Sequence, residues 1–329
     1  MYVRPARNAI NTAKETHNMN YVENMINISQ PEYNKQFWNF MKGDKFAAEN
    51  IEAGRSMATG TYFLPAAANN KYEAAIAKES VIRSIASVFF RFDGPAEIIT
   101  ADCDDIAKFV PEFGNIDIRN VKNDFSAVKV KSNKLATLLR TPSEFVADAT
   151  FDFEGYLVKR LAKNFARAED KAFINGTGTN EPVGILNPTA GADTGASTAS
   201  LTYDDVISLY FSVEAKYRKN AVWLMNDTTA MTLRKLKDGN GNYLWNNADN
   251  TIFGKPVVIS EYMPNAAADK KPIVFGDFSY YWIVKRSPVS VKMLYELFAL
   301  SHQTGYLAFE FIDGRLIRSE AIKVLKITA

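Results

Sequence analysis

The side chains that most often perform catalysis are scarce in this chain of 329 residues, which holds one cysteine and two histidines. Cys103 lies in the run Asp-Cys-Asp-Asp, and neighbouring carboxylates raise the pKa of a thiol and so disfavour the nucleophilic thiolate. His17 and His302 are far apart in the sequence, and no Gly-x-Ser-x-Gly motif accompanies them. A nucleophile needs a positioned base. The sequence therefore predicts no catalytic residue and a protein that is not an enzyme.

Two short motifs resemble ligand loops. The run Asp238–Asn242 begins like a calcium loop, but Tyr243 replaces the glycine of its sixth position and Asp249 the glutamate of its twelfth. The run Gly176–Asn180 follows an expected helix and lacks the Gly-Lys-Ser/Thr ending of a phosphate loop. A tight turn and a helix stop are the simpler interpretations, so we expect neither a metal nor a cofactor.

Charge is nearly balanced, with 39 basic and 37 acidic residues and a net charge of +2. Basic and acidic residues alternate along most of the chain, which disfavours a dedicated nucleic-acid binder. Acidic residues between 102 and 112 are interpreted as a solvated loop, with a divalent-ion site as the alternative. Arg4, Arg7 and Lys14 could contact DNA or a neighbour, or only solvent.

The single cysteine excludes an internal disulfide and fits a reducing cytoplasm. No apolar run approaches the 18 or so residues of a membrane span, and the N-terminus lacks the apolar stretch of a secretory signal. We expect a soluble protein, made in the cytoplasm, without a membrane partner.

Residues 1–60 differ from the rest of the chain. They are rich in Asn and hold one apolar cluster around Phe37, Trp38 and Phe40. We expect an arm with one or two helices, packed on another part of the molecule or on a neighbour. A short helix running into a strand is expected over 71–90.

Alternation of apolar and polar residues predicts strands at AEIIT, FSAVKV and KLATLL within residues 91–140. A long hairpin over about 91–131 is the simplest interpretation. Because an isolated two-stranded hairpin is marginally stable, it needs a surface to lie on.

The clearest helix extends from about 151 to 174, where apolar residues recur every three or four positions. Residues 187–200 are small and polar and predict a surface loop. Helices are expected over 203–218, with Thr202 and Asp205 as a capping box, and from 226 or 227 to 236. Strands are expected at AVWLMN, KPVVIS, PIVFG, YYWIV, VSVKML, YLAFEFIDG and AIKVLKI. Without a regular βαβ rhythm, the class is α+β.

The order of four segments resembles the major capsid protein family of tailed double-stranded DNA bacteriophages. They are AKFVPEFGN, then FDFEGYLVKRLAKNFARAEDKAFINGTGTNEPVGIL, then VWLMNDTTAMTLRKLKDGNGNYLW and FGKPVVISEYMP. In addition, the final stretch, GYLAFEFIDGRLIRSEAIKVLKI, is similar to the closing strands of that family. The resemblance covers roughly residues 60–329.

The resemblance implies a phage capsid fold. The expected parts are an N-terminal arm (1–60), an arm-to-core segment (61–90), an extended hairpin loop (91–131), a peripheral domain with a long spine helix (132–180 and 280–329) and an axial domain (181–279). It also implies a homo-oligomer of hexamers and pentamers forming an icosahedral head in the virion, assembled in the host bacterial cytoplasm. Scaffolding and portal proteins, and packaged double-stranded DNA in weak non-specific contact, are the other implied partners. The residues expected at inter-subunit contacts are Trp38, Lys108, Phe109, Glu112, Phe113 and Arg119.

Two departures from the family pattern carry expectations. Some members link subunits through isopeptide bonds between a hairpin Lys and a C-terminal Asn. Lys108 is a possible hairpin Lys, but residues 266–329 contain no Asn, so we expect a shell without such bonds. About 60 residues precede the core, so we expect a separate scaffolding protein or none, rather than a cleaved scaffolding region. The alternatives are an encapsulin-like nanocompartment shell, an enzyme, and a phage decoration or tail-tube protein.

Overall fold

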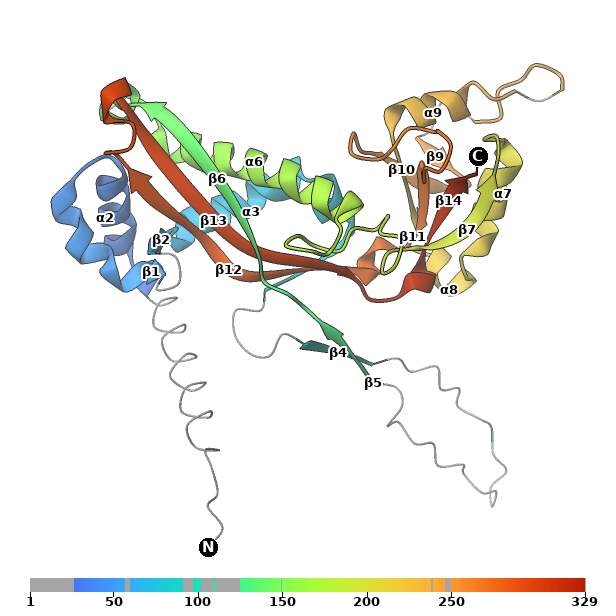
Figure 1. Ribbon diagram of the computed structural model, residues 1–329, viewed down its shortest axis with the longest axis horizontal. Coiled ribbons are helices and arrows are strands. Elements are labelled where there is room, and N and C mark those ends of the chain that lie inside the picture. The colour runs from blue at the N-terminus through green and yellow to red at the C-terminus, as the bar shows by residue number, and fades with distance from the viewer. Residues whose placement is uncertain are drawn as a thin grey trace, which may run out of the picture.

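The computed structural model describes residues 27–56, 60–90, 97–101, 109, 125–148, 150–237, 239–245 and 250–328. The molecule is elongated, with one sheet along its length and a second sheet at the opposite end from α2 (Figure 1). Helices and antiparallel-rich sheets occur together, so the α+β class predicted from the sequence is confirmed.

The first sheet is built around two long strands, β12 (Tyr281–Leu294) and β13 (Gln303–Leu316). They pair antiparallel, and a bulge interrupts the register between Lys285 and Ser290. The sequence predicted two strands where β12 is continuous, because Ser287 and Pro288 resemble a turn. In the described residues the strand order is β1 (Arg55–Ser56), β2 (Thr61–Phe63), β12, β13 and β6 (Asn133–Pro142), and β3 (Ser87–Phe90) pairs with β12.

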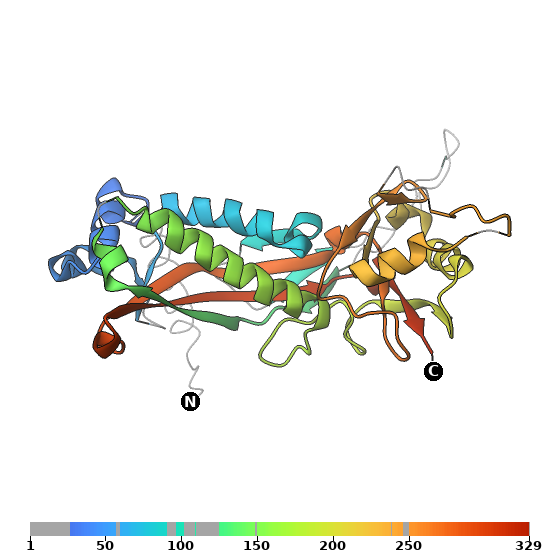
Figure 2. The same cartoon turned by 90° about the horizontal axis from the view of Figure 1, so that it is seen from above.

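Helices α3 (Ala66–Glu79) and α6 (Phe153–Asn175) lie side by side on one face of this sheet (Figure 2). α6 is the helix predicted over 151–174. Asp152 caps its start by accepting a hydrogen bond from the Gly155 N–H at 2.9 Å. Its apolar stripe is fully buried against α3 and the sheet, and includes Leu157, Leu161, Phe165 and Phe173.

The helix stop predicted at residues 176–180 is confirmed, although its geometry differs from a left-handed cap. Gly176 has φ −61° and ψ 141°, which is extended backbone. A Cβ at this position would lie 2.2 Å from the Pro182 carbonyl oxygen and 2.4 Å from that of Ala172. Glycine is required because the chain turns back closely against the end of α6.

The N-terminal part of the described chain packs on the end of the first sheet. It consists of α2 (Pro31–Met41) and a 3₁₀ segment (Lys45–Gly54). Trp38 is 7% exposed and meets the rings of Phe37 and Phe153 edge-on, and the Tyr306 hydroxyl donates to the Met41 carbonyl at 2.9 Å. The predicted helices of the arm are thus confirmed over this range, and Trp38 packs on its own chain.

The second sheet is built around buried strands in the order β7 (Asp193–Thr198), β14 (Ile322–Ile327), β11 (Ile273–Gly276), β8 (Val222–Met225), β10 (Lys255–Ile259) and β9 (Thr251–Ile252) among the described residues. Its helices are α7 (Tyr203–Ser212), α8 (Ala215–Arg218) and α9 (Asp227–Arg234). The capping box of Thr202 and Asp205 is present as predicted.

Three predictions in this region were wrong. The expected loop over 187–200 contains the strand β7, which pairs parallel with β14. The expected helix over 203–218 breaks at Val213 and Glu214, where an extended backbone lets Val213 become fully buried. Residues 322–327 pair with β11 and β7, so the end of the chain belongs with the expected axial residues 181–279 and not with the spine helix.

The described base of the predicted hairpin consists of β4 (Glu97–Ala101) and β5 (Phe125–Lys129), paired antiparallel. Apart from Phe109, Val130 and Lys131, its other residues lie outside the described part of the chain. Figure 1 shows this pair projecting from the long sheet. The remaining short helices are α4 (Val81–Ile85), α5 (Ser143–Ala147), and 3₁₀ turns at Phe278–Tyr280, Ala299–Ser301 and Ser319–Ala321.

Candidate assembly surfaces and a buried ionic cluster

Charged side chains meet inside the layer between the helices and the first sheet. Arg83, from α4, donates from Nε to Glu169 Oε2 at 2.7 Å and from Nη2 to Glu169 Oε1 at 3.0 Å. This bidentate pair is almost fully buried, with side-chain exposures of 3% and 1%. Planar guanidinium–carboxylate pairing of this kind holds two elements at a fixed distance, here α4 against α6.

The same cluster reaches the sheet through Lys285 of β12 and Glu310 of β13. Lys285 Nζ lies 2.7 Å from Glu310 Oε1 and also contacts Glu73 of α3. Arg83 completes the ring at 3.3 Å from Glu73 and 3.6 Å from Glu310. We call the set the ionic cluster; its members are Glu73, Arg83, Glu169, Lys285 and Glu310, and the Tyr72 hydroxyl donates to Glu310 at 2.5 Å.

Three carboxylates share two cations in the ionic cluster, so full ionisation would leave one buried negative charge unmatched. Burial raises the pKa of Glu169 to about 7, although Arg83 opposes the shift. Burial also acts on Glu310, but there the attraction of Lys285 and Arg83 outweighs it, and the pKa is lowered. One carboxyl of the cluster therefore takes up a proton near neutral pH, and that carboxyl is Glu169.

Asp170, beside Glu169, has a different role. It is 3% exposed and accepts hydrogen bonds from the Ser80 hydroxyl and from the N–H groups of Val81 and Ile82. It thus satisfies the free donors at the start of α4. Glu169 and Asp170 of α6 thus both attach α4 to this helix.

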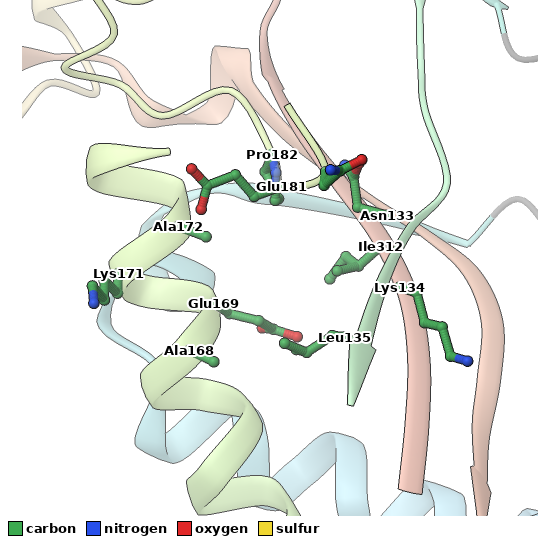
Figure 3. A pocket seen from close by; sticks show the side chains of 11 residues that line it. Asn133, Lys134, Leu135, Ala168, Glu169, Lys171, Ala172, Glu181, Pro182 and Ile312 are labelled. Atoms are coloured by element: carbon green, nitrogen blue, oxygen red, sulfur yellow. The ribbon is translucent and has the colours of Figure 1, made fainter. Parts of the chain in front are cut away.

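A groove of about 250 Å³ opens between α6 and β6. Figure 3 shows Lys171 and Lys134 pointing away from one another at its two sides, with Glu169 facing inward. Glu169 is engaged by Arg83, and Glu181 accepts from the backbone and hydroxyl of Thr177 at 2.9 Å. Both acids of the groove are therefore held by hydrogen bonds within the chain, and neither is free to act with a neighbouring base in catalysis.

The other residues considered for chemistry give no site either. His302 is exposed in a left-handed turn (φ 53°) after the Ala299–Ser301 helix. His17, Cys103, Asp238 and the acidic residues between 102 and 112 lie outside the described residues. Across the described part of the chain, no three His, Cys, Asp or Glu side chains gather closely enough to hold a metal ion. Among the described helices none is both long and apolar enough to cross a lipid bilayer.

Large apolar side chains remain exposed at the end of the long sheet. We call this the tip patch; it consists of Phe145, Tyr295, Leu297 and Leu300, with exposures of 53, 42, 66 and 102%. The two segments that carry it meet where the Ser143 N–H donates to the His302 carbonyl at 3.0 Å.

A second apolar area lies on the face of the first sheet opposite α3 and α6. Successive strand residues alternate between faces. Tyr306, Ala308 and Glu310 point toward the helices, so Leu307 and Phe311 point to the other side. Leu138 of β6, paired with Leu307, is 45% exposed there, and Lys134 lies 3.8 Å over the Phe309 ring.

The predicted inter-subunit residues are only partly described. Lys108, Glu112, Phe113 and Arg119 lie outside the described residues, whereas the Phe109 side chain is fully exposed. A single chain does not test contacts with a neighbour, so the six residues, Trp38 included, stay predictions.

The ionic cluster was not predicted from the sequence. A signal was present: Glu169 occupies the position between Phe165 and Phe173 on the buried stripe of α6, and Glu310 sits at an inward position of an alternating strand. A charge at a core position indicates a buried partner.

The profile described as the phage capsid family matches residues 60–327. This match covers most of the chain and includes both sheets apart from β1. The chain belongs to the phage capsid family. The phage capsid fold expected from the resemblance is therefore confirmed, and the protein is a capsid shell protein.

Relatives agree with this assignment. The capsid polyprotein of Pseudomonas phage PAJU2 is 28% identical over 156 residues, which is 45% of this chain and 23% of that protein. The major capsid protein of Klebsiella oxytoca phage phiKO2 is 26% identical over 180 residues, 50% of this chain and 42% of that protein. The matched segments thus span less than half the length of either relative.

Among solved structures, the capsid of an empty GTA particle has a TM-score of 0.65 and 29% identity, covering 76% of this chain and 90% of that one. The capsid of the native GTA particle gives a TM-score of 0.60 at the same identity, with 76% and 91% coverage. A Gordonia phage Cozz chain, at 16% identity and a TM-score of 0.54 over 76% of this chain and 87% of that one, shares the fold.

Proposed function

We propose that this chain assembles into hexamers and pentamers that close into an icosahedral phage head around double-stranded DNA, with no catalytic activity of its own. Assembly takes place in the host bacterial cytoplasm with scaffolding and portal proteins, and the product is the virion. The relatives named above are phage and GTA capsids, which favours a head over an encapsulin-like nanocompartment.

The observation that carries the proposal is the apolar surface left open on one chain. The tip patch and the Leu138 side of the first sheet expose large side chains at two separate places. Soluble monomers rarely leave such areas uncovered. Closed symmetric assemblies bury the same patches in every copy.

The parts of the subunit have distinct roles in this proposal. The hairpin based on β4 and β5 lies across a neighbouring subunit, which supplies the surface that a two-stranded hairpin needs. The residues from 181 to 279, together with β14, meet their copies around the five-fold and six-fold axes. Residues before 61 extend along the shell and contact neighbours.

The test is assembly of purified chain, measured by size-exclusion chromatography and negative-stain electron microscopy. Wild-type chain should give closed shells or rings of subunits. Leu297→Asp and Leu300→Asp each place a charge in the tip patch and should lower the assembled fraction by on the order of tenfold or more. A loss of about 1.4 kcal/mol of contact free energy is enough to weaken an association constant tenfold. Asn70→Asp adds the same charge on the exposed face of α3 and should assemble like wild type.

Circular dichroism separates folding from assembly. The two Leu variants should keep the wild-type spectrum, because both side chains are exposed. Wild-type levels of shells from both variants would contradict the role of the tip patch. A wild-type chain that stays monomeric would contradict the proposed function itself.

A further inference from the structure

The solvent face of α6 is strongly basic. Its exposed cations are Lys159, Arg160, Lys163, Arg167 and Lys171. At 3.6 residues per turn these positions fall within an arc of about 120°, and at 1.5 Å per residue they extend over about 18 Å. We call this the basic stripe. Within the described residues, none of its five members forms an ion pair with a carboxylate.

The fold creates this stripe by sorting charges that alternate in the sequence. Glu169 turns inward to Arg83, and Asp170 is covered by the start of α4. Glu154 is half-buried and pairs with Lys71 of α3 at 2.6 Å. All three acids of α6 are therefore engaged elsewhere, and its exposed face carries positive charge alone.

The surroundings of the basic stripe indicate a polyanion and not a protein. Protein interfaces have an apolar core, whereas nucleic-acid interfaces are polar and positively charged. Between the cations lie the half-buried Asn164 and Ala168, and the exposed side chains of neighbouring α3 include Ala74 and Ala77. Tyr156, at the first turns of α6, is the single large apolar side chain exposed on the described part of these two helices.

The opposite side of the same layer has a mixed character. There the first sheet presents Leu138, Leu307 and Phe311, which suit contact with another subunit, beside the exposed cations Lys134, Arg140 and Lys292. The described α6 face lacks such an apolar area, so it is the face left free for the contents of a shell. The proposed function supplies those contents as duplex DNA, whose phosphates present one negative charge per about 1.7 Å of axis.

We propose that the α3–α6 layer forms the inner wall of the shell and that the basic stripe contacts the phosphates of packaged duplex DNA without sequence preference. This inference rests on the proposed function and goes beyond it by assigning the inner face and its DNA contacts. Each subunit contributes a few weak contacts with phosphates, and the many copies in a shell together give a large total binding free energy for the DNA.

The experiment compares duplex binding by dissociated subunits, using fluorescence anisotropy of a short random-sequence duplex in a salt titration from about 50 to 200 mM. The test variant is Lys163→Gln/Arg167→Gln/Lys171→Gln. The matched control, Lys219→Gln/Lys235→Gln/Lys270→Gln, removes three exposed cations from the other end of the molecule. Both variants change the net charge by the same amount.

The expected result is a loss confined to the basic stripe. Removing three phosphate contacts lowers the slope of log K against log[salt] by about 2 to 3, and the affinity at about 0.1 M salt by on the order of 10²-fold. The control variant should keep the wild-type slope. Equal slopes for wild type and both variants, or equal losses in both variants, would overturn the inference.

A second measurement needs no substitution. In DNA-filled and emptied particles, the reactivity of Lys159, Lys163 and Lys171 toward an amine-acetylating reagent is compared with that of Lys219 and Lys235. Protection of the first three in filled particles supports the inference, and equal reactivity overturns it. A stripe variant that binds DNA normally but no longer assembles would instead indicate an acidic protein partner and also overturns it. Failure of the wild-type chain to form particles tests the proposed function separately.

Discussion

Replacing Arg83 by methionine tests whether the ionic cluster holds the subunit together. The change removes both hydrogen bonds to Glu169 and the attraction of Arg83 for Glu310, while roughly keeping the buried volume. Both carboxyls have fully buried side chains, with exposures of 1% and 0%. Breaking a buried ion pair by removing one partner costs about 3–5 kcal/mol, because the other charge is left unpaired away from water.

The assay is urea denaturation of the dissociated subunit at about pH 8, with Lys71→Met as the matched control. Lys71 pairs with Glu154 at 2.6 Å, but its side chain is 64% exposed. A surface pair of this kind contributes about 0.2–1 kcal/mol. Arg83→Met should therefore reduce the free energy of unfolding several times more than the control.

Two further comparisons identify the cause of the loss. The double variant Arg83→Met/Glu169→Met removes both charges and should recover part of the stability, since well-packed apolar residues can replace a buried pair. At about pH 5 the cost of Arg83→Met should shrink, because Glu169 is then protonated. Equal losses for Arg83→Met and Lys71→Met, or a loss independent of pH, would refute the reasoning.

Three other changes have expected outcomes. Glu169→Gln should remove a pH dependence of stability. Because the pKa of Glu169 is raised to about 7, the folded chain binds one more proton than the unfolded chain between about pH 4.5 and 7, and the contribution of this carboxyl to the free energy of unfolding falls by about 3 kcal/mol as the pH rises through that window. Urea denaturation curves of the variant should lack that fall. Asp152→Ala should cost about 1 kcal/mol by thermal melting, since the Gly155 N–H at the start of α6 loses its acceptor; no change in Tm would contradict the cap. Leu161→Ala should cost about 2–5 kcal/mol in urea, because the side chain is fully buried and leaves a cavity; a cost below about 1 kcal/mol would contradict its place in the core.

Elements with strong local patterns could be predicted from the sequence. The apolar stripe of α6, the capping box of Thr202 and Asp205 and the alternation in β13 each depend on residues close together in the chain. Such patterns act on the local backbone, so a single sequence carries the information.

Elements imposed by distant partners could not be predicted in this way. β7 is made of small polar residues with no alternation, and it is a strand because β14, some 130 positions later, offers its edge. The same pairing moves residues 322–327 into the second sheet. Long-range pairing overrides weak local preference.

The basic stripe could not be predicted from the sequence for a related reason. A near-zero net charge and alternating signs along the chain disfavoured a clustered basic surface. In the fold, Glu169 and Asp170 are engaged by α4, and this leaves the basic stripe without exposed acids on its helix. Which acids of α6 are buried depends on α4 and the sheet, so the sequence alone does not show that the exposed face of α6 is basic.

The most direct test of the shell assignment is a three-dimensional electron cryo-microscopy reconstruction of particles made from this chain. We predict a closed icosahedral shell of five-subunit and six-subunit rings, with the tip patch covered by neighbouring copies and α6 facing the lumen. A chain that remains monomeric, even with a scaffolding partner, or that forms open filaments would contradict it.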